Sequence, residues 1–182
     1  MSVSIIIILI YMSFFPDFFI WPIGSEASTQ SLSQDVGFLK KLALWIVFAI
    51  SLLGYIAPLL MAVYSLQEDI FNSLTLTSIF GVGVAVAGRI ITSIGALNLK
   101  SSLSELHTTA IFSISRNPIS LGMHLTFMGL IIICKEWWLV VPFVFYTVNI
   151  DLKINLEEKA LVRKFGRAYV DYQSKTPKYL LV

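Results

Sequence analysis

Residues 154–172, "INLEEKALVRKFGRAYVDY", place two adjacent carboxylates, Glu157 and Glu158, before a run of basic and aromatic residues. Lys153 precedes Glu157 by four positions, so on a helix both side chains lie on one face. Glu158 is turned away from them by about 100°. One carboxylate can therefore face a pocket while the other pairs elsewhere. Two interpretations stay open: a solvated tail with an ion pair worth a few tenths of a kcal/mol, or a lid over an active site.

A second polar segment, residues 98–118, reads "NLKSSLSELHTTAIFSISRNP". Its Arg116, like Lys153, is a cation that can orient an anionic group, and its His107 can accept a proton. The chain contains no Gly-x-Ser-x-Gly elbow, no His-Glu-x-x-His motif and no phosphate-binding loop. A single cysteine gives no metal-ligand spacing. We therefore expect chemistry that depends on binding and positioning a ligand, without a metal.

The elements that carry these residues are membrane helices by composition. Of the 182 residues, 57% are hydrophobic and 13% are charged, whereas soluble domains carry about twice that share of charge. This indicates an integral membrane protein with a single domain, residues 1–182. The net charge of +2 is too small to indicate a nucleic-acid partner.

Five apolar segments are long enough to cross a hydrocarbon core of ~30 Å. They are residues 2–23, 38–66, 70–97, 118–134 and 137–158. Only helices satisfy their backbone polar groups in lipid without closing a barrel. We therefore predict an all-α integral membrane protein with about five transmembrane helices and a cytoplasmic helical tail, residues 151–182. The first segment lacks the basic start and the cleavage site of a signal peptide, so we expect a retained helix.

Basic residues near the helix ends predict the topology. If the basic tail lies in the cytoplasm, alternation places these further basic residues inside: Lys40, Lys41, Lys100 and Arg116. Lys135 then falls outside. The N-terminus is expected outside and the C-terminus in the cytoplasm, so that the segment 98–118, the end of the fifth helix and the tail share one face.

Two further polar residues lie inside predicted helices. Arg89 is an intramembrane charge, which indicates a functional residue by default, although its side chain could also snorkel to the interface. If it faces a pocket, Arg89 can attract a substrate carboxylate or pair with Glu157. His124, one turn into the fourth helix, is better explained as a hydrogen-bonded structural residue.

Glycines and aromatics predict packing features. The glycine-rich stretch 81–88, "GVGVAVAG", is a weak echo of a dinucleotide fingerprint, but inside a membrane helix small residues favour close helix packing. Gly166 is expected to end one helical segment and start another. Four side chains before and after it follow helical spacing and form an amphipathic stripe: Leu161, Phe165, Tyr169 and Tyr172.

"ISRNPISLG", followed about forty residues later by "EEKALVRKFGRAYVDYQSKTPKYL", resembles the membrane-bound isoprenylcysteine carboxyl methyltransferases and their phospholipid methyltransferase relatives. The resemblance covers roughly residues 88–181. It implies S-adenosylmethionine as cofactor, with Glu157 as its main ligand. The cofactor-binding residues that the resemblance implies are Leu106, His107, Phe112, Asn117, Pro118, Ile119, Ser120, Glu157 and Glu158. It places Lys153 beside a substrate carboxylate, and we add Arg89 and Arg116 as candidate catalytic cations.

The sequence departs from that family pattern at four positions. Phe112 and Ser120 stand where tyrosines are usual, so two phenol hydroxyls are absent. Asn117 replaces a histidine but can still donate and accept hydrogen bonds. Lys153 replaces an arginine and loses bidentate carboxylate geometry.

The implied chemistry is methyl transfer from a sulfonium, which is a strong electrophile. A carboxylate acceptor needs no base, so catalysis can consist mostly of alignment in a dry pocket, whereas an amine needs a base such as Glu158 or His107. We favour a lipophilic acceptor from the inner leaflet, a prenylated cysteine carboxylate or a similar amphiphile. The alternatives are a phospholipid or small-amphiphile N-methyltransferase, an NADPH-dependent relative of sterol-type reductases, and a non-catalytic lipid-binding homologue.

Overall fold

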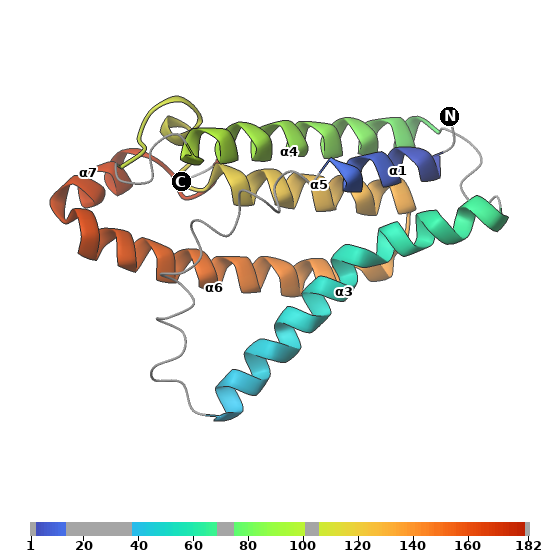
Figure 1. Ribbon diagram of the computed structural model, residues 1–182, viewed down its shortest axis with the longest axis horizontal. Coiled ribbons are helices and arrows are strands. Elements are labelled where there is room, and N and C mark those ends of the chain that lie inside the picture. Colours follow the sequence, from blue (N-terminus) through green and yellow to red (C-terminus); the bar gives the residue numbers. More distant parts are fainter. Residues whose placement is uncertain (1–2, 14–37, 69–74, 101–105, 181–182) are drawn as a thin grey trace.

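The computed structural model describes residues 3–13, 38–68, 75–100 and 106–180. All the regular secondary structure within these ranges is helical, as predicted (Figure 1). The helices are α1 (Val3–Met12), α3 (Phe38–Glu68), α4 (Leu76–Lys100), α5 (Pro118–Cys134), α6 (Val140–Phe165) and α7 (Arg167–Lys175). Two 3-10 turns, η3 (Ala110–Ser113) and η4 (Trp137–Leu139), precede α5 and α6.

Three stretches are long and apolar enough to cross a membrane: residues 49–66, 76–99 and 137–165. The 17 residues of α5 span about 25 Å at 1.5 Å per residue, and the 10 residues of α1 span less. Residues 14–23 of the predicted first segment lie outside the described residues. The number of five crossings therefore stays a prediction, while the all-α membrane class is confirmed.

The last long helix continues beyond the predicted segment 137–158. It runs to Phe165, where Gly166 ends it with a φ of 56°. That φ lies in the left-handed region, which glycine adopts without a steric penalty. Glu157 and Glu158 therefore lie on regular helix, and α6 continues for about two turns beyond them before α7 begins.

The most intimate packing is between α4 and α5, which run antiparallel and place glycines against each other's backbone. A Cβ atom on Gly88 would come within 2.5 Å of the Gly122 carbonyl oxygen, and one on Gly129 within 2.5 Å of the Ala85 nitrogen. A Cβ atom on Gly81 would come within 2.9 Å of the Gly129 carbonyl oxygen, whereas Gly83 faces open space. The packing interpretation of residues 81–88 is thus confirmed for its first and last glycines.

The other helices complete the bundle around this pair. Figure 1 shows α3 crossing α6 obliquely and α1 lying along α4 and α5. At the crossing, a Cβ on Gly54 would overlap the ring of Pro142. The side chains that α1 contributes to the core, Val3, Ile7 and Ile10, pack with Ala62 and Leu130.

Large apolar side chains cover the outer surface of the long helices, as lipid contact requires. The most exposed on α3 and α4 are Trp45, Leu53, Leu60, Leu76, Phe80 and Leu97. Trp137 is 80% exposed at the turn between α5 and α6, and tryptophan is enriched at the interface between membrane and water.

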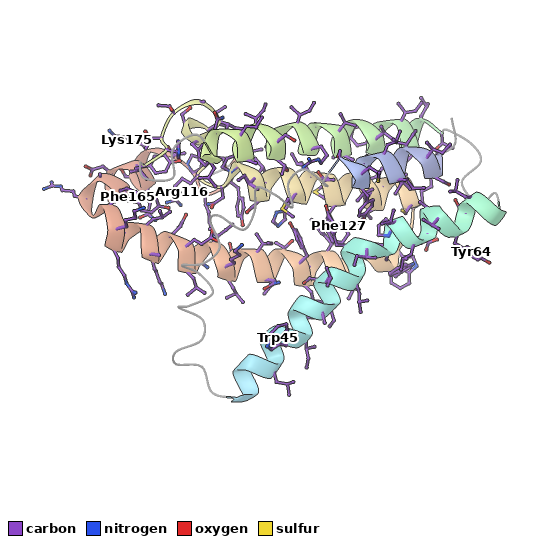
Figure 2. The ribbon with its side chains drawn as sticks, viewed as in Figure 1. Trp45, Tyr64, Arg116, Phe127, Phe165 and Lys175 are labelled. Carbon is purple, nitrogen blue, oxygen red and sulfur yellow. The ribbon has the colours of Figure 1, made fainter. Side chains whose placement is uncertain are left out.

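The polar segments gather at the two ends of the bundle. Lys135 lies at one end, where its Nζ donates to Thr75 Oγ1 at 3.0 Å. Figure 2 shows Arg116, Phe165 and Lys175 at the opposite end, where α6 meets α7. The segment 106–118, the end of α6 and the tail therefore share one end of the molecule, as the topology predicted.

Candidate functional site

The C-terminal tail reverses direction at Gly166 and packs against the segment that precedes α5. The predicted helix break at Gly166 is confirmed. On α7, Tyr169 and Tyr172 are 3% and 8% exposed. The Tyr172 hydroxyl donates to the Phe112 carbonyl at 2.6 Å, and burial raises the pKa of Tyr172 to about 12. The phenol therefore stays protonated and keeps this hydrogen bond across the physiological pH range.

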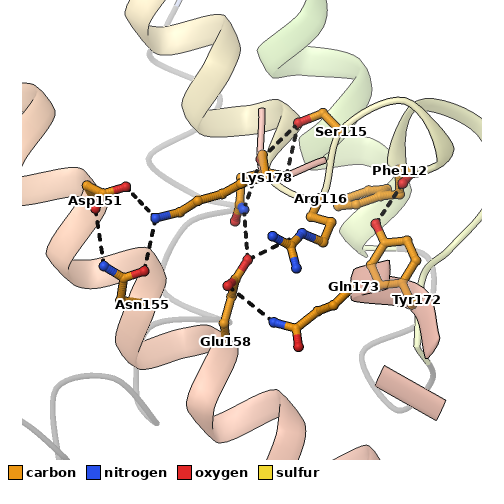
Figure 3. Close-up of polar contacts among 10 residues, drawn as sticks. Phe112, Ser115, Arg116, Asp151, Asn155, Glu158, Tyr172, Gln173 and Lys178 are labelled. Atoms are coloured by element: carbon orange, nitrogen blue, oxygen red, sulfur yellow. Dashed lines mark hydrogen bonds and ion pairs between the residues drawn. The ribbon is translucent and has the colours of Figure 1, made fainter. Parts of the chain in front are cut away.

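Beyond α7 the chain runs beside the "SRNP" motif and pairs with it (Figure 3). The Arg116 N–H donates to the Pro177 carbonyl at 3.0 Å. The Lys178 carbonyl accepts from Asn117 Nδ2 at 3.2 Å and from Ser115 Oγ at 3.3 Å. These contacts join residues about sixty positions apart, so the tail forms a folded cover over the start of α5.

Glu158 lies at the centre of this arrangement. Its Oε1 is 3.6 Å from Arg116 Nε, and the two side chains are only 14% and 13% exposed. Asn117 Nδ2 donates to Oε1 at 3.5 Å, and Gln173 Nε2 donates to Oε2 at 3.3 Å. Because the pair is shielded from water, its attraction is stronger than on a surface, and the amides satisfy further lone pairs. One carboxylate thus joins α6, α7 and the "SRNP" motif.

Glu157 has different surroundings. Its Oε1 lies 3.6 Å from Lys153 Nζ, and the side chains are 37% and 30% exposed. This is the four-residue pair that the spacing predicts on one helix face. The Glu157 carboxylate is partly exposed and pairs only within α6, whereas that of Glu158 contacts the "SRNP" motif and α7.

A second cluster of polar side chains lies one to two turns before Glu158 on α6. The sequence analysis did not predict this cluster. The Lys178 Nζ is paired with Asp151 Oδ1 and donates to Asn155 Oδ1 at 3.0 Å. Asn155 Nδ2 donates to Asp151 Oδ2 at 3.1 Å. The available signal was the polar stripe Asp151, Asn155 and Glu158, four and three positions apart on an apolar helix.

The predicted residues before α5 lie around Phe112. The His107 ring centroid is 5.8 Å from that of Phe112, which is 7% exposed. Leu106 is half-buried in the same segment. The hydrogen bond from Tyr172 joins Phe112 to the tail, and His107 lies beside Phe112 through the contact of their rings.

The predicted residues at the start of α5 pack against α4. Pro118 is fully buried in the first turn of α5, and the Ile119 carbonyl accepts from Thr92 Oγ1 at 3.5 Å. The Ser120 carbonyl accepts from the His124 ring at 2.6 Å. These contacts fix the position of the motif's backbone at the start of α5.

Arg89 lies on the side of α4 that faces α1. It is 7% exposed, and its Nε donates to Ser13 Oγ at 2.9 Å while Nη2 donates to the Ser13 carbonyl at 2.5 Å. It also lines a pocket of about 540 Å³ between α1 and α4. Arg89 therefore contacts the end of α1. The Glu158 network is built from other parts of the chain: α6, α7 and the "SRNP" motif.

The fold and the clustered polar end define a multi-pass membrane protein of helical architecture. Residues 72–168, just over half of the chain, match the sequence profile of the phospholipid methyltransferase family. The chain belongs to this family, which confirms the resemblance, and it is a membrane methyltransferase that acts on lipid substrates. No curated protein and no solved structure matches the chain with significance.

Proposed function

We propose that this chain, as a single domain of residues 1–182, transfers a methyl group from S-adenosylmethionine to a lipophilic acceptor. The observation that carries the proposal is the assembly around Glu158, which unites the "SRNP" motif, the end of α6 and the tail at one end of the bundle. These are the three segments to which the family resemblance assigns the cofactor. The site would lie on the cytoplasmic side, with the N-terminus of the chain outside.

The residues at this end suit an amino-acid-bearing nucleoside. Arg116 Nε is buried and lies 3.6 Å from Glu158 Oε1, but it makes no hydrogen bond to the described residues, so the guanidinium keeps an N–H group that a ligand carboxylate could accept from. The Glu157 carboxylate is open to an amino group or to ribose hydroxyls. His107 and Phe112 offer aromatic surface beside them. The donor, acceptor and apolar groups that the cofactor needs are therefore all present.

When bound, S-adenosylmethionine supplies an electrophilic methyl group on a sulfonium. The protein's task is then to bind, align and exclude water. Glu158 holds Arg116 and Asn117 in position, and the buried aromatics of α7 close the cover over them. No covalent contribution from a side chain is required.

Two classes of acceptor fit the site. A prenylated cysteine carboxylate is supported by Lys153, whose partly exposed ammonium lies at the end of α6. A lipid amine is supported by the family, whose description names phospholipids. Either amphiphile would enter laterally from the inner leaflet, because apolar side chains cover the outer faces of the helices.

The methyl-donor assignment is tested by ligand-dependent thermal stability of the purified protein in lipid nanodiscs. We expect S-adenosylmethionine and S-adenosylhomocysteine to raise the melting temperature and NADPH to have no effect. Glu157→Gln should weaken binding about tenfold or more, because a charge-assisted hydrogen bond contributes about 1.5–3 kcal/mol. Glu136→Gln, in the turn at the opposite end, is the matched control.

Stabilisation by NADPH alone would contradict the proposal and favour the reductase alternative. Absence of stabilisation by all three ligands would favour a non-catalytic lipid-binding protein. The acceptor is then identified by transfer of labelled methyl to farnesylated cysteine and to phosphatidylethanolamine in the same nanodiscs.

A further inference from the structure

A pocket of about 510 Å³ lies between α5 and α6 and is closed at one side by the tail. Its lining residues are Leu121, His124, Thr147, Val148, Asp151, Leu152 and Tyr179. Val148 and Leu152 are 48% and 45% exposed on the outer face of α6. The pocket is therefore open to the lipid side along an apolar wall, and its volume suits an amphiphilic ligand.

His124 presents a basic nitrogen to this pocket. Its Nδ1 lies 2.6 Å from the Ser120 carbonyl oxygen, which can only accept, so Nδ1 carries the ring proton. In the neutral ring Nε2 then bears a lone pair, and the described residues make no hydrogen bond to it. The rings of Tyr146 and Tyr179 lie 5.1 and 5.8 Å from the imidazole centroid. The ring of Phe143 also contacts the imidazole. Ser120 and these three aromatic rings thus hold the orientation of the base.

The polar end of the pocket carries both signs of charge and an unused hydrogen-bonding group. Asp151 and Lys178 form an ion pair there. The hydroxyl of Tyr146 is buried and has no hydrogen-bond partner among the described residues, whereas the Tyr179 hydroxyl lies beside the Asp151 carboxylate. Tyr146 is only 7% exposed. A headgroup with an ammonium and a phosphate complements this end, the first through Asp151 and the aromatic faces and the second through Lys178.

The pocket adjoins the proposed cofactor site on both helices. His124 follows Asn117 by seven positions on α5, and Asp151 precedes Glu158 by seven positions on α6. Seven residues are two turns, or about 10 Å along a helix axis. Lys178 connects the two regions, because its side chain pairs with Asp151 and its carbonyl accepts from Asn117. A headgroup in the pocket can therefore reach the proposed methyl donor.

We propose that this pocket binds the headgroup of an amine-bearing membrane lipid and that His124 Nε2 removes the proton from its ammonium. This inference rests on the proposed function and adds to its lipid-amine alternative a binding pocket and a base on this chain. The ammonium N–H bond breaks, the proton moves to Nε2, and the freed lone pair forms the N–CH3 bond. The S–CH3 bond of the sulfonium donor breaks at the same time, and its electron pair stays on sulfur.

The first test compares His124→Asn with the parent protein on two acceptors. Asparagine can keep the hydrogen bond to Ser120 but has no basic nitrogen. We expect methylation of phosphatidylethanolamine at neutral pH to fall about a hundredfold, as for loss of a general base, and to recover as pH approaches the pKa of the lipid amine. Binding of S-adenosylhomocysteine should be unchanged. Met128→Ala, one turn further on the exposed side of α5, is the matched control.

The parent protein supplies a second test that does not depend on a variant folding. Its rate on phosphatidylethanolamine should rise with pH as the imidazole of His124 loses its proton and becomes able to act as a base. Groups that face His124 and shape this profile are Asp151 and Tyr146 on α6 and Tyr179 in the tail, and Lys178 acts on it through its ion pair with Asp151. A profile that follows only the lipid amine would overturn the role of His124.

The two proposals fail in distinguishable ways. If S-adenosylmethionine binds and only farnesylated cysteine is methylated, the amine pocket is wrong and the proposed function stands. If His124→Asn methylates phosphatidylethanolamine at the parent rate, the base assignment is wrong. If no adenosyl compound binds, the proposed function itself fails.

Discussion

Glu157 and Glu158 are neighbours in the sequence, but helical geometry sends their side chains in directions about 100° apart. Glu157 pairs with Lys153 at the partly exposed surface of α6. Glu158 meets Arg116, Asn117 and Gln173 in a shielded position. At the residue scale the two carboxylates therefore have separate tasks: Glu158 holds the protein together, and Glu157 is available for a ligand.

This difference predicts that substitution of Glu158 lowers the free energy of unfolding far more than substitution of Glu157. Glu158→Ala leaves Arg116 without its anion in a shielded site, so we expect a loss of about 3 kcal/mol in the free energy of unfolding. Glu157→Ala removes a partly exposed ion pair and should change it by less than about 0.5 kcal/mol. Unfolding by titration with sodium dodecyl sulfate in mixed micelles measures both. Equal stability losses in the two variants would contradict the assignment.

At the scale of elements, small residues decide how α4 and α5 meet. Gly88 and Gly122 face each other's backbones, and Gly129 faces Ala85. In lipid, apolar burial contributes little to helix association, so close backbone approach provides the van der Waals contact. This hairpin matters for function because α5 starts at the "SRNP" motif, whose position depends on its seating against α4.

Two glycines of α4 offer a matched comparison. Gly88→Leu places a side chain where the Gly122 carbonyl lies, so we expect a loss of at least about 2 kcal/mol in stability and weaker cofactor binding. Gly83→Leu adds the same volume to open space and should be tolerated. Thermal melting of both variants in nanodiscs, with and without S-adenosylhomocysteine, measures the difference. Similar melting temperatures would show that the α4–α5 contact is not tight.

At the scale of the whole molecule, the bundle has one functional end. The "SRNP" motif, the last turns of α6 and the tail lie together there, and the turn with Lys135 and Trp137 lies at the other (Figure 1). The excess of basic residues at the first end predicts that it faces the cytoplasm. A water-soluble cofactor would then enter from the cytoplasm while the acceptor arrives through the lipid.

The orientation is testable because the chain has a single cysteine, Cys134, which is buried. In a Cys134→Ser background, a cysteine at Glu136 should react with a membrane-impermeant maleimide in intact cells. A cysteine at the exposed Ser174 should react only after permeabilisation. The reverse labelling pattern would invert the topology and place the site on the other side of the membrane.

The family membership, the helical class and the membrane location follow from the sequence alone, because composition, apolar length and motif spacing are local properties. The break at Gly166 and the pairing of Lys153 with Glu157 are equally local, since they depend on one or four positions. Only the tertiary structure decided that Glu158 meets Gln173 and Asn117, that Lys178 returns to Asp151, and that Arg89 contacts Ser13. Those contacts join distant segments, and helical periodicity carries no information about which faces meet after the chain reverses.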